Sequence, residues 1–510
     1  MDLLSNLMAG MSTVLTPITL MYCFLGVLLG TAVGVLPGIG ALATISLLLP
    51  ITYYIPPTPA IIMLAGVYYG AQYGGSTAAI LLNLPGTPTS AVACLDGYPM
   101  SRQGRAGVAL FMTTIASFVG AMFGLVLLIS FAPAIVELAL VLGSAEYFTL
   151  MLLGLMAAST LASGSLPKSL AMVVLGLLLG TIGTDINTGI DRFTFGFYSL
   201  MDGLSIIALA MGVFGIAEVI SNVNNPAPTG AGQKISLRSM LPTRQDWRDS
   251  AWPMLRGSGV GAFFGALPGT GASISSFMAY AFEKKLAADP ARFGQGAIEG
   301  VSAPEAANNA SVQTAFVPTL TLGIPGDVVM ALMLGALIMH GITPGPLLML
   351  EQPELFWGLI ASFVVGNIML LVLNIPLIGV WVSLLRIPYR VLYPVILIFI
   401  SLGVYSAGNN IFDIYMVAVI GALGYAMSVF RFQPAPLLLG FILGPMMEES
   451  FRRTMLLSRG ELMIFFERPI SATILTITLA MLAWAIARVL YGAYRQRSVA
   501  AAAAKDAQGL

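Results

Sequence analysis

Long apolar runs separated by short polar breaks recur along the whole chain. Most runs are close to the roughly 20 residues that an α-helix needs to cross the hydrocarbon core of a bilayer. The pattern therefore predicts an all-α polytopic membrane protein with about 11–14 membrane segments, some of them broken helices or re-entrant hairpins. The simple apolar spans lie near residues 14–35, 107–134, 143–164, 168–189, 196–221, 252–267, 355–383, 391–407, 411–429, 434–446 and 470–492.

Two regions, 36–100 and 267–346, are also apolar but are interrupted by Gly, Pro, Ser, Thr and Asn. Each region contains two Pro-Gly breaks with a cluster of small polar residues between them. The first break of the second region closely repeats that of the first region. The sequence "GVLPGIGA" at 34–41 recurs as "GALPGTGA" at 265–272, 231 positions later. The other two breaks are "NLPGTPTS" (83–90) and "GIPGDVV" (323–329), and the two polar clusters are "YGAQYGGSTA" (69–78) and "PEAANNASVQ" (304–313).

A Pro-Gly pair ends a helix sharply, because proline removes a backbone donor and glycine permits positive φ. In lipid the freed backbone groups must be satisfied, so such breaks occur where they are buried in protein or line a wet cavity. Helix N-termini at the breaks can bind an anion, and nearby hydroxyls and amides can add ligands. The alternative is that the small residues only let helices pack closely. The expected substrate-binding residues are Gly38, Gly40, Ser76, Thr77, Asn83, Gly86, Thr87, Ser90, Gly269, Gly271, Ser273, Asn308, Asn309, Ser311 and Gly326.

Two carboxylates and two carbonyl groups are the candidates for binding a coupling cation. They belong to Glu305, Asp327, Pro37 and Pro268. For Glu305 the alternative is a hairpin tip in water, and for Asp327 it is an N-cap of the following helix. We expect Asp96 in a turn and His340 at a helix end.

Charge sets the expected orientation. Charged residues make up only 9% of the chain and 23 basic residues balance 23 acidic ones, so no nucleic-acid surface is expected. Lys and Arg in short loops place the N-terminus outside the membrane and the C-terminus on the cytoplasmic side. The two LPG breaks would then lie at opposite faces, as inverted-topology repeats require. The expected units are an N-terminal membrane repeat (1–221), a basic cytoplasmic linker (222–251), a C-terminal membrane repeat (252–495) and a cytoplasmic tail (496–510).

Three arginines disagree with the expected orientation, and several motifs of metal sites, enzymes and nucleotide-binding proteins are absent from the sequence. Arg192, Arg452 and Arg453 fall on the outer side of this scheme, each near acidic residues. His340 is the only histidine and the two cysteines are far apart, so neither a resident metal nor enzymatic activity is expected. The chain has no GxxxxGK[ST] phosphate loop and no clear signal peptide, so we expect no nucleotide cofactor and a mature N-terminus.

Several stretches resemble signatures of one family, the large membrane subunit of tripartite tricarboxylate transporters. The resemblance covers nearly the whole chain apart from its last residues. The stretches are "GVLPGIGA", "YGGSTAAILLNLPGTPTSAVACLDGYPMSRQGRAG", "GALPGTGA", "EGVSAPEAANNAS", "LTLGIPGD" and the C-terminal "LGFILGPMMEESFRRTMLLSRGELMIFFERPIS" (439–471).

The resemblance implies a permease in the bacterial inner membrane that works with a small four-helix membrane subunit and a periplasmic substrate-binding protein. It also implies uptake of citrate or another tricarboxylate or dicarboxylate, driven by a Na⁺ or H⁺ gradient with no other cofactor. A stand-alone carboxylate carrier and a passive anion channel are the alternatives. The carboxylate, the coupling ion and the oligomeric state stay open at this point.

Overall fold

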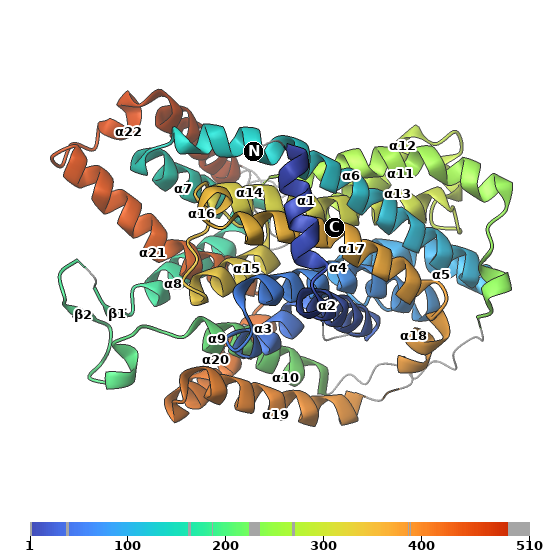
Figure 1. Cartoon of the computed structure of the whole chain (residues 1–510), viewed down its shortest axis with the longest axis horizontal. Coiled ribbons are helices and arrows are strands. Elements are labelled where there is room, and N and C mark those ends of the chain that lie inside the picture. Colours follow the sequence, from blue (N-terminus) through green and yellow to red (C-terminus); the bar gives the residue numbers. More distant parts are fainter. Residues whose placement is uncertain are drawn as a thin grey trace, which may run out of the picture.

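The computed structural model describes residues 3–36, 40–161, 165–185, 187–223, 235–267, 271–385, 387 and 389–487. Within these ranges the regular secondary structure is helical apart from one small antiparallel hairpin, in which Gly183 pairs with Arg192 and Thr184 with Asp191. The fold is therefore all-α, as the apolar pattern predicts (Figure 1).

The elements follow in chain order. The first part contains α1 (Leu3–Val14), α2 (Pro17–Val35), α3 (Gly40–Thr52), α4 (Pro57–Leu82), η1 (Pro88–Val92), α5 (Ala93–Arg102), α6 (Ala106–Leu140), α7 (Ser144–Leu161), α8 (Leu166–Gly180), β1 (Gly183–Thr184), β2 (Asp191–Arg192), η2 (Tyr198–Leu200), α9 (Ile206–Ala210), the π-helical η3 (Met211–Ile216) and α10 (Ala217–Val223). The second part contains η4 (Leu237–Met240), α11 (Arg244–Gly265), α12 (Gly271–Leu286), η5 (Pro290–Arg292), α13 (Glu299–Thr314), α14 (Phe316–Leu322), α15 (Val328–Met339), α16 (Leu348–Glu351), α17 (Pro353–Asn374), α18 (Ile378–Leu384), α19 (Tyr389–Gly408), α20 (Ile411–Val429), α21 (Pro434–Leu457) and α22 (Ile464–Glu467).

Five helices in the described ranges are long and apolar enough to cross a membrane. Shorter apolar helices, among them α3, α8 and α15, lie between them, as expected of a protein that combines full spans with broken ones. The chain is thus a multi-pass membrane protein. The five long helices are α2, α6, α17, α20 and a last helix at Pro469–Ala487.

The structure corrects three of the expected spans. The span 168–189 ends early, because α8 stops at Gly180 and the polar stretch that follows forms the β1–β2 hairpin. The span 196–221 becomes helical only at Ile206. The span 355–383 is two helices, because Pro376 lacks an N–H and disfavours helix at the residue before it. Apolar composition alone could not show these interruptions.

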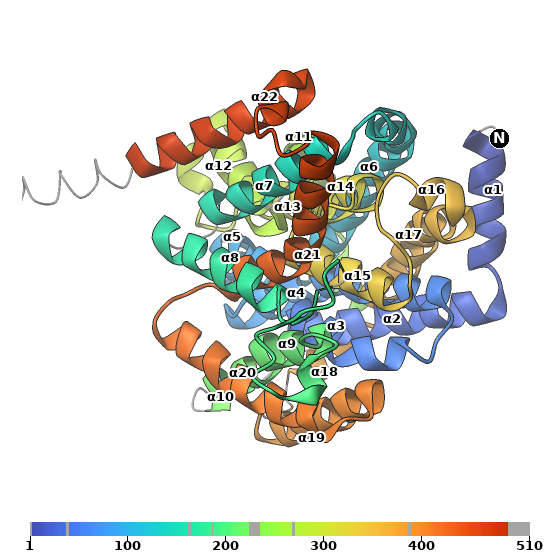
Figure 2. The ribbon, with the colours of Figure 1, turned by 90° about the vertical axis from the view of Figure 1, so that its left-hand side faces the viewer.

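Helices α4 and α13 occupy the interior, and α4 lies near the middle of both views (Figures 1 and 2). Every residue from Pro59 to Ile80 of α4 is buried, as is every residue from Gly300 to Thr314 of α13. Both helices carry buried polar side chains, and each of these needs a hydrogen-bonding partner in this environment.

Each central helix packs tightly on one partner through glycines spaced four residues apart. A Cβ atom at Gly30 or Gly34 of α2 would overlap with backbone atoms of α4, and one at Gly261 or Gly265 of α11 would overlap with backbone atoms of α13. The two sets of glycines are 231 positions apart, the same offset as the two LPG sequences. Because glycine has no Cβ atom, the backbones of the paired helices come into direct contact at these positions.

Helices from the two parts of the chain are interleaved. Helix α6 packs on α13, and α17 packs on α4. The carbonyl oxygen of Ala306 in α13 reaches the position that a Cβ of Gly120 in α6 would occupy. Each central helix is therefore enclosed by one helix near to it in sequence and one from the other part of the chain.

The arginines that disagreed with the expected orientation are mostly paired. Arg452 forms two hydrogen bonds of 3.0 Å with Asp185 and contacts Glu448 at 2.7 Å, and Arg192 contacts Glu448 at 2.8 Å. The hydrogen bonds from Arg452 and from the backbone of Asn187 lower the pKa of the Asp185 carboxyl to about 2, so it stays ionised at physiological pH. Acidic residues thus pair with Arg192 and Arg452, so the positive charge of these two arginines is weak evidence against the expected orientation.

The close packing of α11 on α13 gives a direct test. Gly261→Ala would push a methyl group into the Ala307 carbonyl, so we expect it to lower the free energy of unfolding by about 1–3 kcal/mol. Gly259→Ala is a matched control on the same helix, since a Cβ there meets no atom within 4 Å. It should be neutral or stabilising by up to about 1 kcal/mol. Thermal unfolding of the detergent-purified variants measures both changes, and equal stability of the two would contradict the packing described.

Candidate functional site

The second break of the first part folds back onto the central helix. Helix α4 ends at Asn83, which has a left-handed backbone with φ 58°. The chain then returns so that Gly86 lies between α2 and α4, where a Cβ would overlap with the Gly34 carbonyl. Thr87 caps η1 in a capping box with Ser90. The break predicted at Pro85–Gly86 is confirmed: the helix ends at the exposed Asn83, and Gly86 and Thr87 after it are buried.

The second break of the second part repeats this arrangement 240 positions later. Helix α14 ends at Gly323, which also has a left-handed backbone with φ 69°. Gly326 packs against Ala315, and Asp327 caps α15 by accepting a hydrogen bond of 2.9 Å from the Met330 N–H. The N-cap that was the alternative for Asp327 is thus present, and His340 lies at the C-cap of the same helix, as predicted.

The first breaks also match each other. Helices α2 and α11 end at Val35 and Gly265, and the next helices begin at Gly40 and Gly271, whose φ angles are 62° and 66°. The second break of each part meets the helix that follows the first break of the other part, since η1 packs against α12 and α15 packs against α3. The described residues that flank the four breaks therefore belong to elements that pack on one another.

Glu305 is the buried carboxylate of this region. It is only 3% exposed, which excludes the alternative of a hairpin tip in water. Its carboxylate accepts hydrogen bonds from Ser76 of α4 at 2.7 Å and from Ser117 of α6 at 3.0 Å. Asn309, one turn later on α13, donates to the Glu305 carbonyl at 3.1 Å and to the carboxylate at 3.5 Å. Three helices thus hold one acid in the protein interior.

A second set of contacts joins η1 to both central helices. Thr89 donates to Gln72 of α4 at 2.6 Å and accepts from Asn308 of α13 at 3.3 Å. Thr87 lies 2.8 Å from Thr89, between their hydroxyl oxygens. A break in one part of the chain is therefore hydrogen-bonded to the polar helix of the other.

The break at Asp327 makes the reciprocal contact. Tyr68 of α4 donates a hydrogen bond to the Asp327 carboxylate, and Gly271 at the start of α12 lies beside the same side chain. On α12, Ser275 donates to Ser311 of α13 at 3.0 Å. Asp327 is thus both a helix cap and a link between the two parts of the chain.

Several polar atoms of α13 have no partner although they are buried. Among the described side chains these include the amide oxygens of Asn308 and Asn309 and both polar atoms of Gln313. Unpaired polar atoms cost free energy in the interior unless a ligand, ion or water satisfies them. Amide oxygens close to a carboxylate form the kind of oxygen-rich environment that holds a proton or a hard cation.

The predicted residues divide into three groups. Pro37, Gly38, Pro268 and Gly269 lie outside the described residues. Asn83 and Ser273 are exposed and partly exposed, and Thr77 is buried on α4. The N–H of Gly86 donates to the Gly75 carbonyl at 3.4 Å, and that of Gly326 donates to the Thr319 hydroxyl at 3.3 Å, so both have protein partners here. Gly40 starts α3, and a Cβ there would meet no atom within 4 Å. The structure brings together Ser76, Gly86, Thr87, Ser90, Gly271, Glu305, Asn308, Asn309, Ser311, Gly326 and Asp327.

Sequence reasoning missed several residues of the region. Gln72 and Tyr73 lie inside the quoted polar cluster and could have been chosen from it, and Tyr73 donates to Asn367 of α17 at 2.9 Å. Ser117 gave no local signal, because it lies within a long apolar span. Polar residues contributed by a distant apolar helix become visible only in the tertiary structure.

Asp96 was expected in a turn, and that expectation is wrong. It lies inside α5, is fully buried, and accepts hydrogen bonds of 2.8 Å from the N–H groups of Gly294, Gly296 and Ala297. Tyr280 donates to its other oxygen at 2.9 Å. A buried carboxylate held by several donors is a strong charge-assisted contact, so Asp96 fastens the α12–α13 loop to α5.

Comparison with known proteins identifies the chain. Residues 20–439 match the model of the tripartite tricarboxylate transporter TctA family. An Agrobacterium vitis protein described as an uncharacterized 52.8 kDa protein in the TAR-I ttuC' 3' region is 51% identical over 480 residues, which are 94% of this chain and 95% of that protein. A second Agrobacterium vitis protein, described as an uncharacterized protein in the TAR-II ttuC' 3' region, is 55% identical over 215 residues, which are 42% of this chain and 89% of that protein. No solved structure matches the chain significantly.

The family match covers more than three quarters of the sequence and includes every break described above. Its members are transporter subunits, not enzymes. The chain belongs to the TctA family, the large membrane subunit of tripartite tricarboxylate transporters.

Proposed function

We propose that this permease imports a carboxylate by secondary transport, coupled to the inward movement of Na⁺ or H⁺ at the buried Glu305 cluster. A periplasmic binding protein delivers the substrate, a tricarboxylate such as citrate or a dicarboxylate, and a small four-helix membrane subunit completes the complex. The complex resides in the bacterial inner membrane, with the N-terminus of this chain in the periplasm and its C-terminus in the cytoplasm.

The observation that carries the proposal is the position of Glu305. Its hydrogen bonds come from α4 and α6, and its helix is joined through Asn308 to Thr89 of η1. A proton or cation bound there would touch both parts of the chain at once. Occupancy of this one site can therefore change how the two parts fit together, as coupled transport requires.

The charge of the substrate supports the same proposal. The two polar clusters, 69–78 and 304–313, contain no lysine or arginine. A carboxylate bound between them needs helix N-termini, amide groups and a co-bound cation for neutralisation. We place the substrate at the four breaks, with Ser76, Thr87, Asn308, Asn309 and Ser311 as the side-chain ligands.

We further propose that the two parts of the chain are inverted repeats. The glycine contacts at an offset of 231 and the second breaks at an offset of 240 support this reading, as does the interleaved packing of α6 and α17. Inverted repeats allow the same pair of broken helices to open first to one side of the membrane and then to the other.

A coupled carrier and a passive channel differ in their response to the gradient. In vesicles containing the complete complex, carboxylate uptake should saturate with substrate and should cease when Na⁺ is replaced and the proton gradient is collapsed. The same assay without the binding protein tests for a stand-alone carrier. Uptake that is unchanged by removal of both gradients would contradict coupling and favour a channel.

Glu305 can be tested with a matched control on the same helix. Glu305→Gln keeps the size of the side chain but removes the charge, so we expect uptake at a fixed gradient to fall at least about tenfold, a change of about 1.4 kcal/mol. Glu299→Gln removes a charge from the start of α13, where Glu299 pairs at the surface with Arg292, and it should have little effect. Normal coupled uptake by Glu305→Gln would remove Glu305 from the site.

A test of Asp327 needs a substitution that removes its negative charge but keeps its N-cap hydrogen bond to α15. Asn is as good an N-cap as Asp, so Asp327→Asn should keep α15 and the thermal stability of the protein. We expect this variant nevertheless to lose most uptake, because the charge beside Gly271 and Tyr68 is gone. Asp327→Ala should lose both stability and uptake. Full uptake by Asp327→Asn would show that this residue acts only as a cap.

A further inference from the structure

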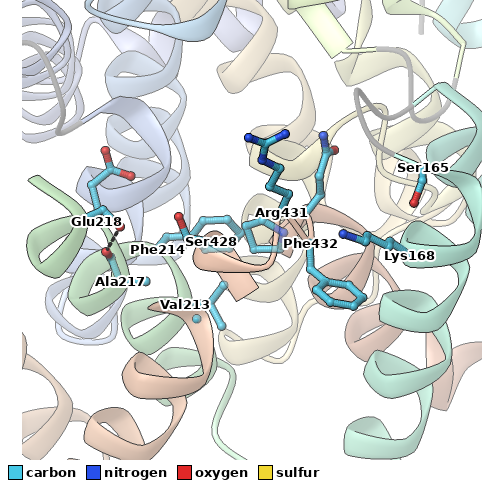
Figure 3. Close-up of a pocket in the computed structure, with 13 residues that line it drawn as sticks. Ser165, Lys168, Val213, Phe214, Ala217, Glu218, Ser428, Arg431 and Phe432 are labelled. Atoms are coloured by element: carbon cyan, nitrogen blue, oxygen red, sulfur yellow. Dashed lines mark hydrogen bonds between the residues drawn. The ribbon is translucent and has the colours of Figure 1, made fainter. Parts of the chain in front are cut away.

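A cavity that none of the break residues lines lies where four helices begin or end. It has a volume of about 550 Å³ and is bordered by the start of α8, by η3 and α10, by the end of α20 and by the start of α21 (Figure 3). Helix α20 is one of the long apolar helices and ends at Val429, just before the cavity. The cavity is therefore at the level where a spanning helix leaves the hydrocarbon core.

Two cations belong to this cavity. The Lys168 ammonium donates to the Phe430 carbonyl at 2.7 Å and lies 5.0 Å from the centre of the Phe432 ring. Arg431 comes from the turn between α20 and α21, and Figure 3 shows Lys168 and Glu218 on opposite sides of it. Two cations and one carboxylate leave a net positive charge, concentrated on the side of Lys168.

Two helix N-termini add to this positive side. Helix α8 has 15 residues and α21 has 24, and both start at the cavity wall, after Ser165 and Gln433. Neither of these N-cap residues caps its helix with its side chain. Pro167, Pro434 and Pro436 lack an N–H group, so these first turns offer fewer donors than usual. The positive dipole ends of both helices still lie at the wall that carries the two cations, a combination that favours an anion.

The backbone at Arg431 is strained in a way that suggests a function. Its φ of 57° lies in the left-handed region, where a helix usually ends with glycine. The turn is closed by hydrogen bonds from the Arg431 N–H to Ser428 and from the Phe432 N–H to Met427, at 3.0 and 2.8 Å. Glycine would make the same turn with less strain, so the arginine side chain is kept at some cost in stability.

The remaining walls combine apolar side chains with small polar ones such as Ser221 and Ser428. Val213 and Phe214 of η3 and Phe432 line the cavity, and side chains of α20 such as Val419 and Leu423 are exposed. A π-helical segment such as η3 is uncommon and is frequent at functional sites. An amphipathic ligand, with a charged head and an apolar body, fits this combination better than a small soluble anion.

We propose that this cavity binds the phosphate headgroup of an anionic phospholipid. Lys168, Arg431 and the N-termini of α8 and α21 hold the phosphate, while the acyl chains lie along α20. Basic pockets between spanning helices at a membrane surface are known to recognise such headgroups. The site is separate from Glu305, so its test does not depend on the transport mechanism.

Thermal unfolding of the full chain in detergent provides the test. We expect phosphatidylglycerol to raise the midpoint, phosphatidylcholine to raise it less, and inorganic phosphate at the same concentration to leave it unchanged. Arg431→Gly should unfold at the same or a higher temperature without lipid, because the strain is relieved. It should bind phosphatidylglycerol about fivefold more weakly, the effect expected of one basic residue, and Lys168→Gln should weaken binding similarly.

Arg459→Gly is the matched control, because Arg459 also has a left-handed backbone, with φ 55°, but lies beyond the other end of α21. It should gain stability in the same way and keep its response to phosphatidylglycerol. The proposal is overturned if Arg431→Gly responds to the lipid like the wild type, or if Arg459→Gly loses the response equally. An equal effect of inorganic phosphate would show a site for soluble anions in place of a lipid site.

Discussion

The direct approach of paired helix backbones is the constraint on which the rest of the structure depends. Glycines at every fourth position bring α2 onto α4 and α11 onto α13. In a bilayer, where no hydrophobic effect drives helices together, such close packing is a main source of association. It also leaves room for the folded-back loops, since Gly86 enters the space beside Gly34. A larger residue along either seam would separate the helices and displace the break that rests on them.

A second constraint follows from burial. Breaking a helix inside an apolar protein exposes backbone groups and admits polar side chains, and each must find a partner. Thr87 and Asp327 cap the helices that follow the second breaks, and Gln72, Thr89 and Asn308 connect one break to both central helices. The atoms that stay unpaired, on Asn308, Asn309 and Gln313, therefore mark the place where a ligand has most to contribute.

The sequence predicted the all-α fold and the positions of the Pro-Gly breaks because both depend on local chemistry. The helix ends at Asn83 and Gly323 follow directly from turn-forming residues. It could not predict Ser117 as a partner of Glu305, because that contact joins residues 188 positions apart across an apolar helix. Nor could it show that Asp96 binds the α12–α13 loop, since local sequence indicated only a turn. Long-range pairing of polar groups, not local propensity, decides which acids are buried and which are solvated.

The central claim is that breaks from both parts of the chain form one substrate site, and cysteine protection tests it most directly. In a background without Cys23 and Cys94, single cysteines replace Pro88 at the start of η1 and Ser273 on α12, two elements that pack together. Both positions are at least partly exposed, so a maleimide can reach them. In vesicles containing the complete complex, carboxylate together with the coupling cation should slow labelling at both positions. Protection of only one position, or of neither, would contradict a shared site.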